Sequence, residues 1–177
     1  VSPETTYTYD SFGNQTGVTD ANSHTTTTAY DTTGTYPTST TNAKSQTSSM
    51  TYDLGTGNLL TKIDPNDTTT TYTYDSFGRI TSEVQPYDSL LYPTTSYRYF
   101  DNAVAPQGRL VSKRTISGVS ATLNAYSFID GLGRTVQTRA DAQDTTASNA
   151  AAAKQIVTDT FYDSTGQVAK QTVPNLD

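Results

Sequence analysis

Residues 72–78 read Tyr-Thr-Tyr-Asp-Ser-Phe-Gly, and the same seven letters stand at residues 7–13. Variants of this segment recur, so that seven units each carry an aspartate directly after Tyr, Phe or Ile. An internal period of this length is typical of repeat architectures. The sequence therefore predicts one tandem array over residues 1–177. The anchoring residues are Asp10, Asp31, Asp53, Asp75, Asp101, Asp130 and Asp163, at separations of 21, 22, 22, 26, 29 and 33 residues.

Each unit is predicted to be a β-hairpin. Tyr72 and Tyr74 lie two residues apart, which places both rings on one face of a strand. Asp75 then opens a turn, because its carboxylate can accept from backbone N–H groups two residues on. Gly78 tolerates the positive φ that closes this turn. A second polar turn follows the next strand in the more regular units, at residues 20–22, 42–44 and 64–66.

The predicted fold class is all-β. One hairpin cannot bury its face alone, so neighbouring hairpins must pair as tandem antiparallel repeats in a continuous curved or spiralling sheet. Only 33 % of the residues are hydrophobic, whereas about 45–50 % is usual in globular chains. A broad aliphatic core is therefore not expected. The 13 tyrosines and the threonine runs at residues 25–28 and 68–71 suit pleated strands instead.

The repeat motif is expected to play a structural role in every unit. Its glycines close turns, and Arg79, Arg109 and Arg134 are expected to pair with carboxylates of an adjacent unit. The motif residues are Tyr9, Asp10, Gly13, Tyr30, Asp31, Gly34, Tyr52, Asp53, Gly57, Tyr74, Asp75, Gly78, Arg79, Asp101, Gly108, Arg109, Asp130, Gly133, Arg134, Tyr162, Asp163 and Gly166.

The later units carry insertions, notably Ala103–Gln107 and residues 141–154. The second insertion contains four consecutive alanines within residues 147–154, which favour helix, yet this run is shorter than the roughly 12–15 residues that a lone helix needs. It is predicted to be an inserted surface loop with one helical turn. Loops on repeat scaffolds commonly carry the partner-specific function.

Charge and composition exclude several classes of partner. The formal net charge of −6, with scattered basic residues, argues against nucleic acid and anionic membrane surfaces. No apolar stretch approaches the ~20 residues that a membrane span requires. The chain has no cysteine, which rules out disulfides, thiolate metal sites and thiol catalysis.

No catalytic, cofactor-binding or metal-binding residue is predicted. The repeated aspartates are interpreted as turn residues rather than as a calcium or acid–base array, because each occupies the same place before a glycine. His24 is the single histidine and lacks triad partners. A glycosidase would need two acidic groups about 5–10 Å apart, and the sequence does not indicate such a pair. The glycines of residues 131–133 lack the third glycine of a nucleotide loop.

The tyrosines are interpreted as core ladders of the sheet in preference to a carbohydrate-stacking platform. Two sequons, at Asn14 and Asn66, fall in or near predicted turns. They matter only in a host that glycosylates secreted proteins.

The motifs resemble a known family. Residues 9–13, residues 74–79 and the Gly133-Arg134 pair are similar to the YD repeat of RHS-repeat proteins, which include bacterial polymorphic toxins, toxin-complex B and C components and the teneurins. Residues 130–137 and 162–171 look more like the toxin-complex B component. The family's autoproteolytic segment has no match, since Asp-Pro at residues 64–65 lacks its glycine context.

This resemblance implies a structural scaffold, not an enzyme, with no cofactor. It implies that the chain is a fragment of a secreted or cell-surface wall: a hollow β-shell that encloses a toxic polypeptide or presents an interaction surface. Expected partners are further YD repeats of the same chain or neighbouring copies, an encapsulated polypeptide, or a cell-surface glycan. An extracellular filament or adhesin of stacked hairpins, with carbohydrate binding, is the alternative, because open sheet edges invite pairing.

Overall fold

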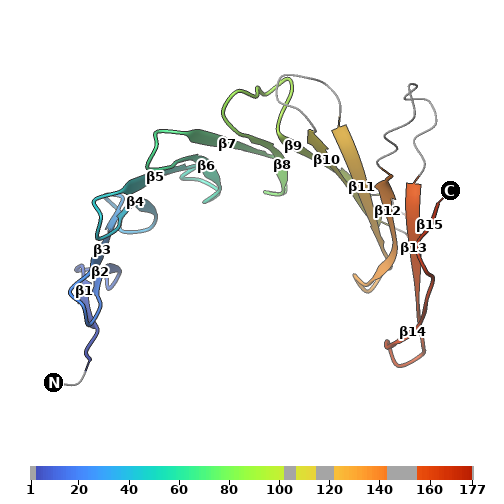
Figure 1. The fold of residues 1–177 in the computed structure, drawn as a ribbon, viewed down its shortest axis with the longest axis horizontal. Coiled ribbons are helices and arrows are strands. Elements are labelled where there is room, and N and C mark those ends of the chain that lie inside the picture. The colour runs from blue at the N-terminus through green and yellow to red at the C-terminus, as the bar shows by residue number, and fades with distance from the viewer. Residues whose placement is uncertain (1–2, 102–106, 115–121, 143–154, 177) are drawn as a thin grey trace. The chain divides into compact units, whose positions relative to one another are not determined.

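The computed structural model describes residues 3–101, 107–114, 122–142 and 155–176. Every helix or strand in these residues is a β-strand (Figure 1). The chain divides into two compact units, Val1–Tyr87 and Asp88–Asp177, called here the first and the second unit. The predicted all-β fold of tandem antiparallel hairpins is confirmed.

The first unit contains eight strands, each paired antiparallel with the next along the chain. Their side chains are dominated by Thr, Ser and Tyr, which fit an accessible pleated surface. The strands are β1 (Thr6–Tyr9), β2 (Gln15–Thr19), β3 (Thr25–Tyr30), β4 (Pro37–Thr41), β5 (Thr47–Tyr52), β6 (Leu59–Ile63), β7 (Thr69–Tyr74) and β8 (Ile80–Val84).

The second unit continues the hairpin pattern, and its strands β10 to β13 are longer, with seven or eight residues each. The last two strands share one edge, because β14 pairs with the end of β13 and β15 pairs with its beginning. The strands are β9 (Thr95–Phe100), β10 (Gln107–Arg114), β11 (Thr122–Ile129), β12 (Thr135–Asp141), β13 (Gln155–Tyr162), β14 (Val168–Gln171) and β15 (Asn175–Leu176).

Both predicted insertions fall largely outside the described residues. Gln107 begins β10 and Asp141 ends β12. Residues 102–106 and 143–154, including the expected helical turn, are not among the residues that the structure describes.

Each unit is a single sheet layer with two accessible faces. Among the described residues, the buried hydrophobic side chains are Val84 and Val157, each 9 % exposed, and the buried polar ones are Ser82 and Thr95. The predicted absence of a broad aliphatic core agrees with this arrangement. Pairing between neighbouring strands, not packing between layers, holds these units together.

A β-bulge marks the hairpins that carry Asp-Gly turns. In one of them, Thr73 of β7 pairs with Ser82 of β8. The next pair joins Tyr74 to Ile80, so that Thr81 is an extra residue. A bulge bends its strand and increases the local twist. The same shift occurs at residues 8–9, 29–30, 51–52, 128–129 and 161–162, whereas the hairpins β2–β3, β4–β5 and β6–β7 pair without a shift.

Candidate functional site

The Asp-Gly turn is the repeated chemical feature of the molecule. Asp75 Oδ1 accepts from the backbone N–H groups of Phe77 and Arg79, both at 2.9 Å. The N–H of Gly78 donates to the carbonyl of Asp75 at 3.0 Å. Gly78 has φ +76°, a conformation that side chains disfavour. One carboxylate and one glycine therefore close the turn.

Five further motif aspartates are placed in the same way. Each accepts from backbone N–H groups two to five residues ahead, and the following turn glycine has a positive φ. These residues are Asp10, Asp31, Asp53, Asp130 and Asp163, with Gly13, Gly34, Gly57, Gly133 and Gly166.

Gly108 and Arg109 differ from this pattern, because both lie inside β10 rather than in a turn. Gly108 pairs with Phe100 on one side and with Phe128 on the other. A Cβ atom at Gly108 would lie 2.9 Å from Phe128 and 3.3 Å from Phe100. This glycine therefore allows two rings to approach, and Asp101 follows β9 without a nearby turn glycine.

The second, polar turns share the hydrogen-bond pattern of the Asp-Gly turns, which the sequence did not reveal. Asn42 Oδ1 accepts from the N–H groups of Lys44 and Gln46 at 2.9 and 3.1 Å. A non-glycine residue, Ser45, adopts φ +61° there. The turns that begin at Asp20 and Asp64 are built alike, with Ser23 at φ +65° and Asp67 at φ +59°.

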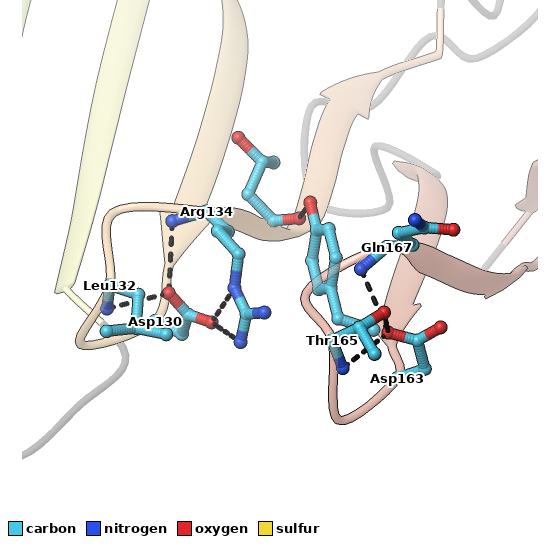
Figure 2. Close-up of polar contacts among 8 residues, drawn as sticks. Asp130, Leu132, Arg134, Asp163, Thr165 and Gln167 are labelled. Atoms are coloured by element: carbon cyan, nitrogen blue, oxygen red, sulfur yellow. Dashed lines mark hydrogen bonds and ion pairs between the residues drawn. The ribbon is translucent and has the colours of Figure 1, made fainter.

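Two motif arginines pair inside their own turns, and for Arg134 this corrects the expectation of pairing with an adjacent unit's carboxylate. Arg79 Nε lies 2.8 Å from Asp75 Oδ2. Arg134 lies 2.7 Å from Asp130 Oδ2 (Figure 2). The guanidinium of Arg134 also lies over the ring of Tyr162, 4.5 Å from its centroid. Arg134 therefore reaches the next repeat through an aromatic ring rather than through a carboxylate.

The motif tyrosines connect successive repeats through their hydroxyl groups. Tyr74 donates to the carbonyl of Leu59 at 2.8 Å, and Tyr162 donates to the carbonyl of Thr135 at 2.8 Å. The hydroxyl of Tyr30 donates a longer hydrogen bond, of 3.4 Å, to the carbonyl of Gln15. Each acceptor directly precedes the extra residue of the preceding repeat's bulge. Because a bulge disrupts the ladder locally, the hydroxyl supplies a donor where the register shifts.

Neighbouring turns of the first unit also touch. Asn14 Nδ2 donates to Asp10 Oδ2 at 3.1 Å and to the carbonyl of Gly34 at 2.7 Å. A Cβ atom at Gly34 would lie 2.6 Å from the ring of Phe12. Further along, the ring of Tyr36 stacks on that of Tyr52 at 5.0 Å. The first three repeats are therefore joined to one another through contacts at their turns.

The turn hydrogen bonds favour ionised aspartates. The side-chain hydrogen bond from Arg134, and then its backbone N–H, lower the pKa of Asp130. The hydroxyl of Thr165 is the first cause that lowers the pKa of Asp163. Burial raises the pKa of Tyr74, which keeps its hydroxyl a hydrogen-bond donor.

The second unit also holds an open depression of about 520 Å³. It is lined in part by Phe128, Phe161, Arg139 and Asp159. Its polar groups are bonded to one another: Arg139 Nε donates to Gln137 Oε1 at 2.7 Å, and Gln137 Nε2 donates to Asp159 Oδ1 at 2.6 Å. Three polar side chains of the lining therefore form a chain of hydrogen bonds with one another.

The remaining candidates are placed as follows. His24 lies 3.0 Å from Asp20, and both side chains are exposed. Within the described residues, no group of three or more His, Cys, Asp or Glu is arranged to hold a metal ion, and no helix is long and apolar enough to cross a membrane. Asn14 is bonded within its turn region, while Asn66 is exposed.

These features define a β-hairpin repeat scaffold. Residues 52–89 match the protein family described as "RHS Repeat", which confirms the RHS-repeat resemblance drawn from the motifs. Among curated proteins, none matches the sequence.

Solved structures share the fold of this chain. The crystal structure of TcdB2-TccC3 matches with a TM-score of 0.73 and 18 % identity, over 94 % of this chain and 10 % of that one. The form without its hypervariable C-terminal region gives a TM-score of 0.70 and 17 % identity, over 98 % and 9 %. A Tc holotoxin pore structure from Photorhabdus luminescens gives 0.65 and 18 %, over 94 % and 9 %. The chain thus spans about a tenth of the chains it matches.

Proposed function

We propose that this chain is a wall segment of a hollow β-shell in a secreted or cell-surface RHS-type protein, and that the shell encloses a polypeptide. Two observations together carry the proposal: the sheet has a single layer, and side chains of successive repeats are joined by hydrogen bonds and by an aromatic contact. A wall needs two accessible faces and strength along its length, and it needs no active site.

The single layer supports this role because both faces of each unit remain available to solvent or to cargo. An ordinary globular domain buries its sheet against a second layer. Here the described residues include only two buried hydrophobic side chains, Val84 and Val157. The sheet faces are therefore free to border an enclosed space.

The joining of successive repeats supports the role because stability accumulates from repeat to repeat. The hydroxyl bonds of Tyr74 and Tyr162 and the aromatic contact of Arg134 each join two consecutive repeats. The fold likeness to TcdB2-TccC3 and to a Tc holotoxin pore agrees with a toxin shell in the extracellular space. The proposed partners are further YD repeats and the enclosed polypeptide.

Negative-stain electron microscopy of the native particle, with the intact mass of its chain, tests the proposal. We expect a compact hollow particle whose enclosed polypeptide resists protease until the shell is unfolded. A thin, open particle whose associated polypeptide is cleaved at once would contradict it.

The filament alternative rests on a different observation. Within the first unit, β1 pairs on one edge with β2, and its four side chains are exposed and uncharged. Such an edge can template a strand from another chain. Continuous fibres in the same micrographs would favour an extracellular filament or adhesin, and binding to a glycan array would favour surface attachment.

A further inference from the structure

One face of the sheet in the second unit gathers aromatic rings. Residues that pair directly across antiparallel strands point to the same face. Gly108 pairs with Phe100 of β9 and with Phe128 of β11, so the two rings share its face. Tyr126 lies two residues from Phe128 and stacks on it, with ring centroids 6.4 Å apart. Phe161 of β13 lines the same depression as Phe128. We call the surface of Phe100, Tyr126, Phe128 and Phe161 the aromatic face.

Each of the three phenyl rings of the aromatic face has a cation over it. The pairs, with the distance from the cation to the ring centroid, are Arg98 over Phe100 at 5.4 Å, Arg139 over Phe128 at 5.7 Å and Lys170 over Phe161 at 5.7 Å. All three cationic residues are exposed. Within the part of the chain that the structure describes, none of the three lies in an ion pair.

The carboxylates on this face are bonded to amide groups instead. Asp159 Oδ1 accepts from Gln137 Nε2 at 2.6 Å. Asp141 Oδ2 accepts from the backbone N–H and the Nδ2 of Asn124, at 2.9 and 2.8 Å. Because a guanidinium on an aromatic ring keeps a fork of N–H donors that matches a carboxylate, Arg98 and Arg139 suit a carboxylate from outside the chain.

The charge of the chain is divided unequally between the two units. The first unit holds three Lys and Arg residues against nine Asp and Glu residues, whereas the second unit holds eight of each. The formal net charge of −6 therefore belongs to the first unit. The second unit is neutral as a whole, so its three cations can attract an acidic partner without opposition from a net negative charge.

The spacing of the cations favours a polymer over a small ligand. Arg98, Leu110, Tyr126 and Arg139 form one row of paired residues across β9 to β12. Three strand spacings separate the two arginines, which is about 14 Å. No single carboxylate spans this distance, but an extended polypeptide covers it in about four residues. Leu110 and Tyr126 lie between the arginines, where apolar side chains of such a segment can pack.

The covered rings favour a polypeptide over an acidic polysaccharide. A sugar ring stacks on the open face of an aromatic side chain, whereas cations already lie over Phe100, Phe128 and Phe161. A polypeptide needs no such platform, because its carboxylates bind the cations and its apolar side chains fill the spaces between them.

We propose that the aromatic face of the second unit binds an extended acidic segment of another polypeptide. Carboxylates of the segment bind Arg98, Arg139 and Lys170, and apolar side chains between them contact Leu110 and Tyr126. This surface lies on one face of one unit, so binding does not depend on closure of the proposed shell.

Fluorescence anisotropy with the full chain tests the proposal. The probe is a labelled peptide that repeats Glu-Val-Ser-Thr four times, which places carboxylates at the spacing of the arginines. We expect it to bind, more weakly as salt is added, and at least tenfold more tightly than the same peptide with Gln in place of Glu. Failure of the Glu peptide to bind, or equal binding of the two peptides, would overturn the proposal.

Two triple variants of equal charge locate the site. Arg98→Gln/Arg139→Gln/Lys170→Gln is expected to weaken binding at least tenfold. The matched control Lys62→Gln/Arg109→Gln/Lys113→Gln removes three exposed cations elsewhere, two of them on the opposite face of β10, and should bind like the wild type. Equal loss in both variants would contradict the assignment to the aromatic face. Circular dichroism checks the fold, and the peptide comparison on the wild-type chain remains decisive if a variant misfolds.

Competition between two acidic polymers identifies the kind of partner. At equal carboxylate concentration, poly-glutamate should displace the labelled peptide at least tenfold more effectively than polygalacturonate does. Equal or stronger displacement by polygalacturonate would make the partner an acidic polysaccharide and overturn the proposal.

Discussion

The hydroxyl of Tyr74 donates a hydrogen bond to the carbonyl of Leu59 at 2.8 Å, across the boundary between two repeats. Leu59 is the residue that pairs with Tyr52, the corresponding tyrosine of the preceding repeat. The next residue, Leu60, is the bulged one. One hydroxyl group thus ties a motif tyrosine to the register shift that follows the preceding Asp-Gly turn.

Tyr74→Phe is expected to lower the free energy of unfolding by about 1 kcal/mol, the usual net contribution of one hydrogen bond. The ring and its packing remain, so the change isolates the hydroxyl. Urea denaturation measures it. Tyr7→Phe is the control, because Tyr7 lies in the edge strand β1 with its side chain 53 % exposed. Equal effects of the two substitutions would show that the bond to Leu59 contributes nothing.

Serine-to-glycine substitutions are expected to have opposite signs at two nearby positions. Ser45→Gly should stabilise the chain by roughly 0.5 kcal/mol, because φ +61° strains a side-chain-bearing residue. Ser49→Gly, inside β5, should destabilise it by roughly 0.5–1 kcal/mol through lost strand preference. Thermal and urea unfolding of both variants provide the comparison. Destabilisation by Ser45→Gly would contradict the strain at this turn.

Glycine-to-alanine substitutions test the Asp-Gly turn itself. Gly78→Ala should cost about 1–2 kcal/mol, because its φ of +76° disfavours a side chain although the nearest atom to an added Cβ is 3.8 Å away. Gly131→Ala meets nothing within 4 Å and has no positive φ. We expect that control to be neutral or slightly stabilising. A neutral Gly78→Ala would contradict the requirement for glycine.

Acid is expected to weaken the fold through the turn aspartates. Hydrogen bonding, first from the hydroxyl of Thr165, holds the folded-state pKa of Asp163 below its ordinary value of 3.8. A lowered folded pKa contributes stability that is present above pH 3.8 and is lost as the pH falls through the folded value. Urea unfolding at pH 7 and near pH 3 should therefore show a decrease at low pH.

Asp163→Asn provides the matched comparison for acid unfolding. The amide oxygen can still accept from backbone N–H groups, as that of Asn42 does, but it does not titrate. The variant should show a smaller loss of stability between the two pH values. An equal loss in both proteins would assign the pH dependence to other groups.

Local chemistry explains which features the sequence predicts. The Asp-Gly turn depends on residues at most four positions apart, as Asp75 and Arg79 show. A hairpin requires only alternation and a turn, so tandem hairpins are readable in the sequence. Absence of a broad core also follows from composition, because so few side chains are apolar.

Features that depend on the register between neighbouring hairpins cannot be predicted from the sequence in this way. The acceptor for Tyr162 is a backbone carbonyl 27 positions away, and any residue can supply that atom. The positive φ at Ser45 is not indicated by the sequence, because the residue there is not a glycine. For Arg134, the choice between its own turn and an adjacent carboxylate is set by side-chain reach, which the repeat pattern leaves open.

The chain-order pairing of β1 to β8 has a consequence for evolution. Among the residues that the structure describes, each strand of this unit pairs with strands that are its sequence neighbours, so these pairings need no segment that is distant in the sequence. Duplication or loss of one complete repeat, about 22 residues in the regular region, would rejoin equivalent strands and leave the other pairings intact. Gene length can therefore change in whole-repeat steps, without a compensating mutation elsewhere.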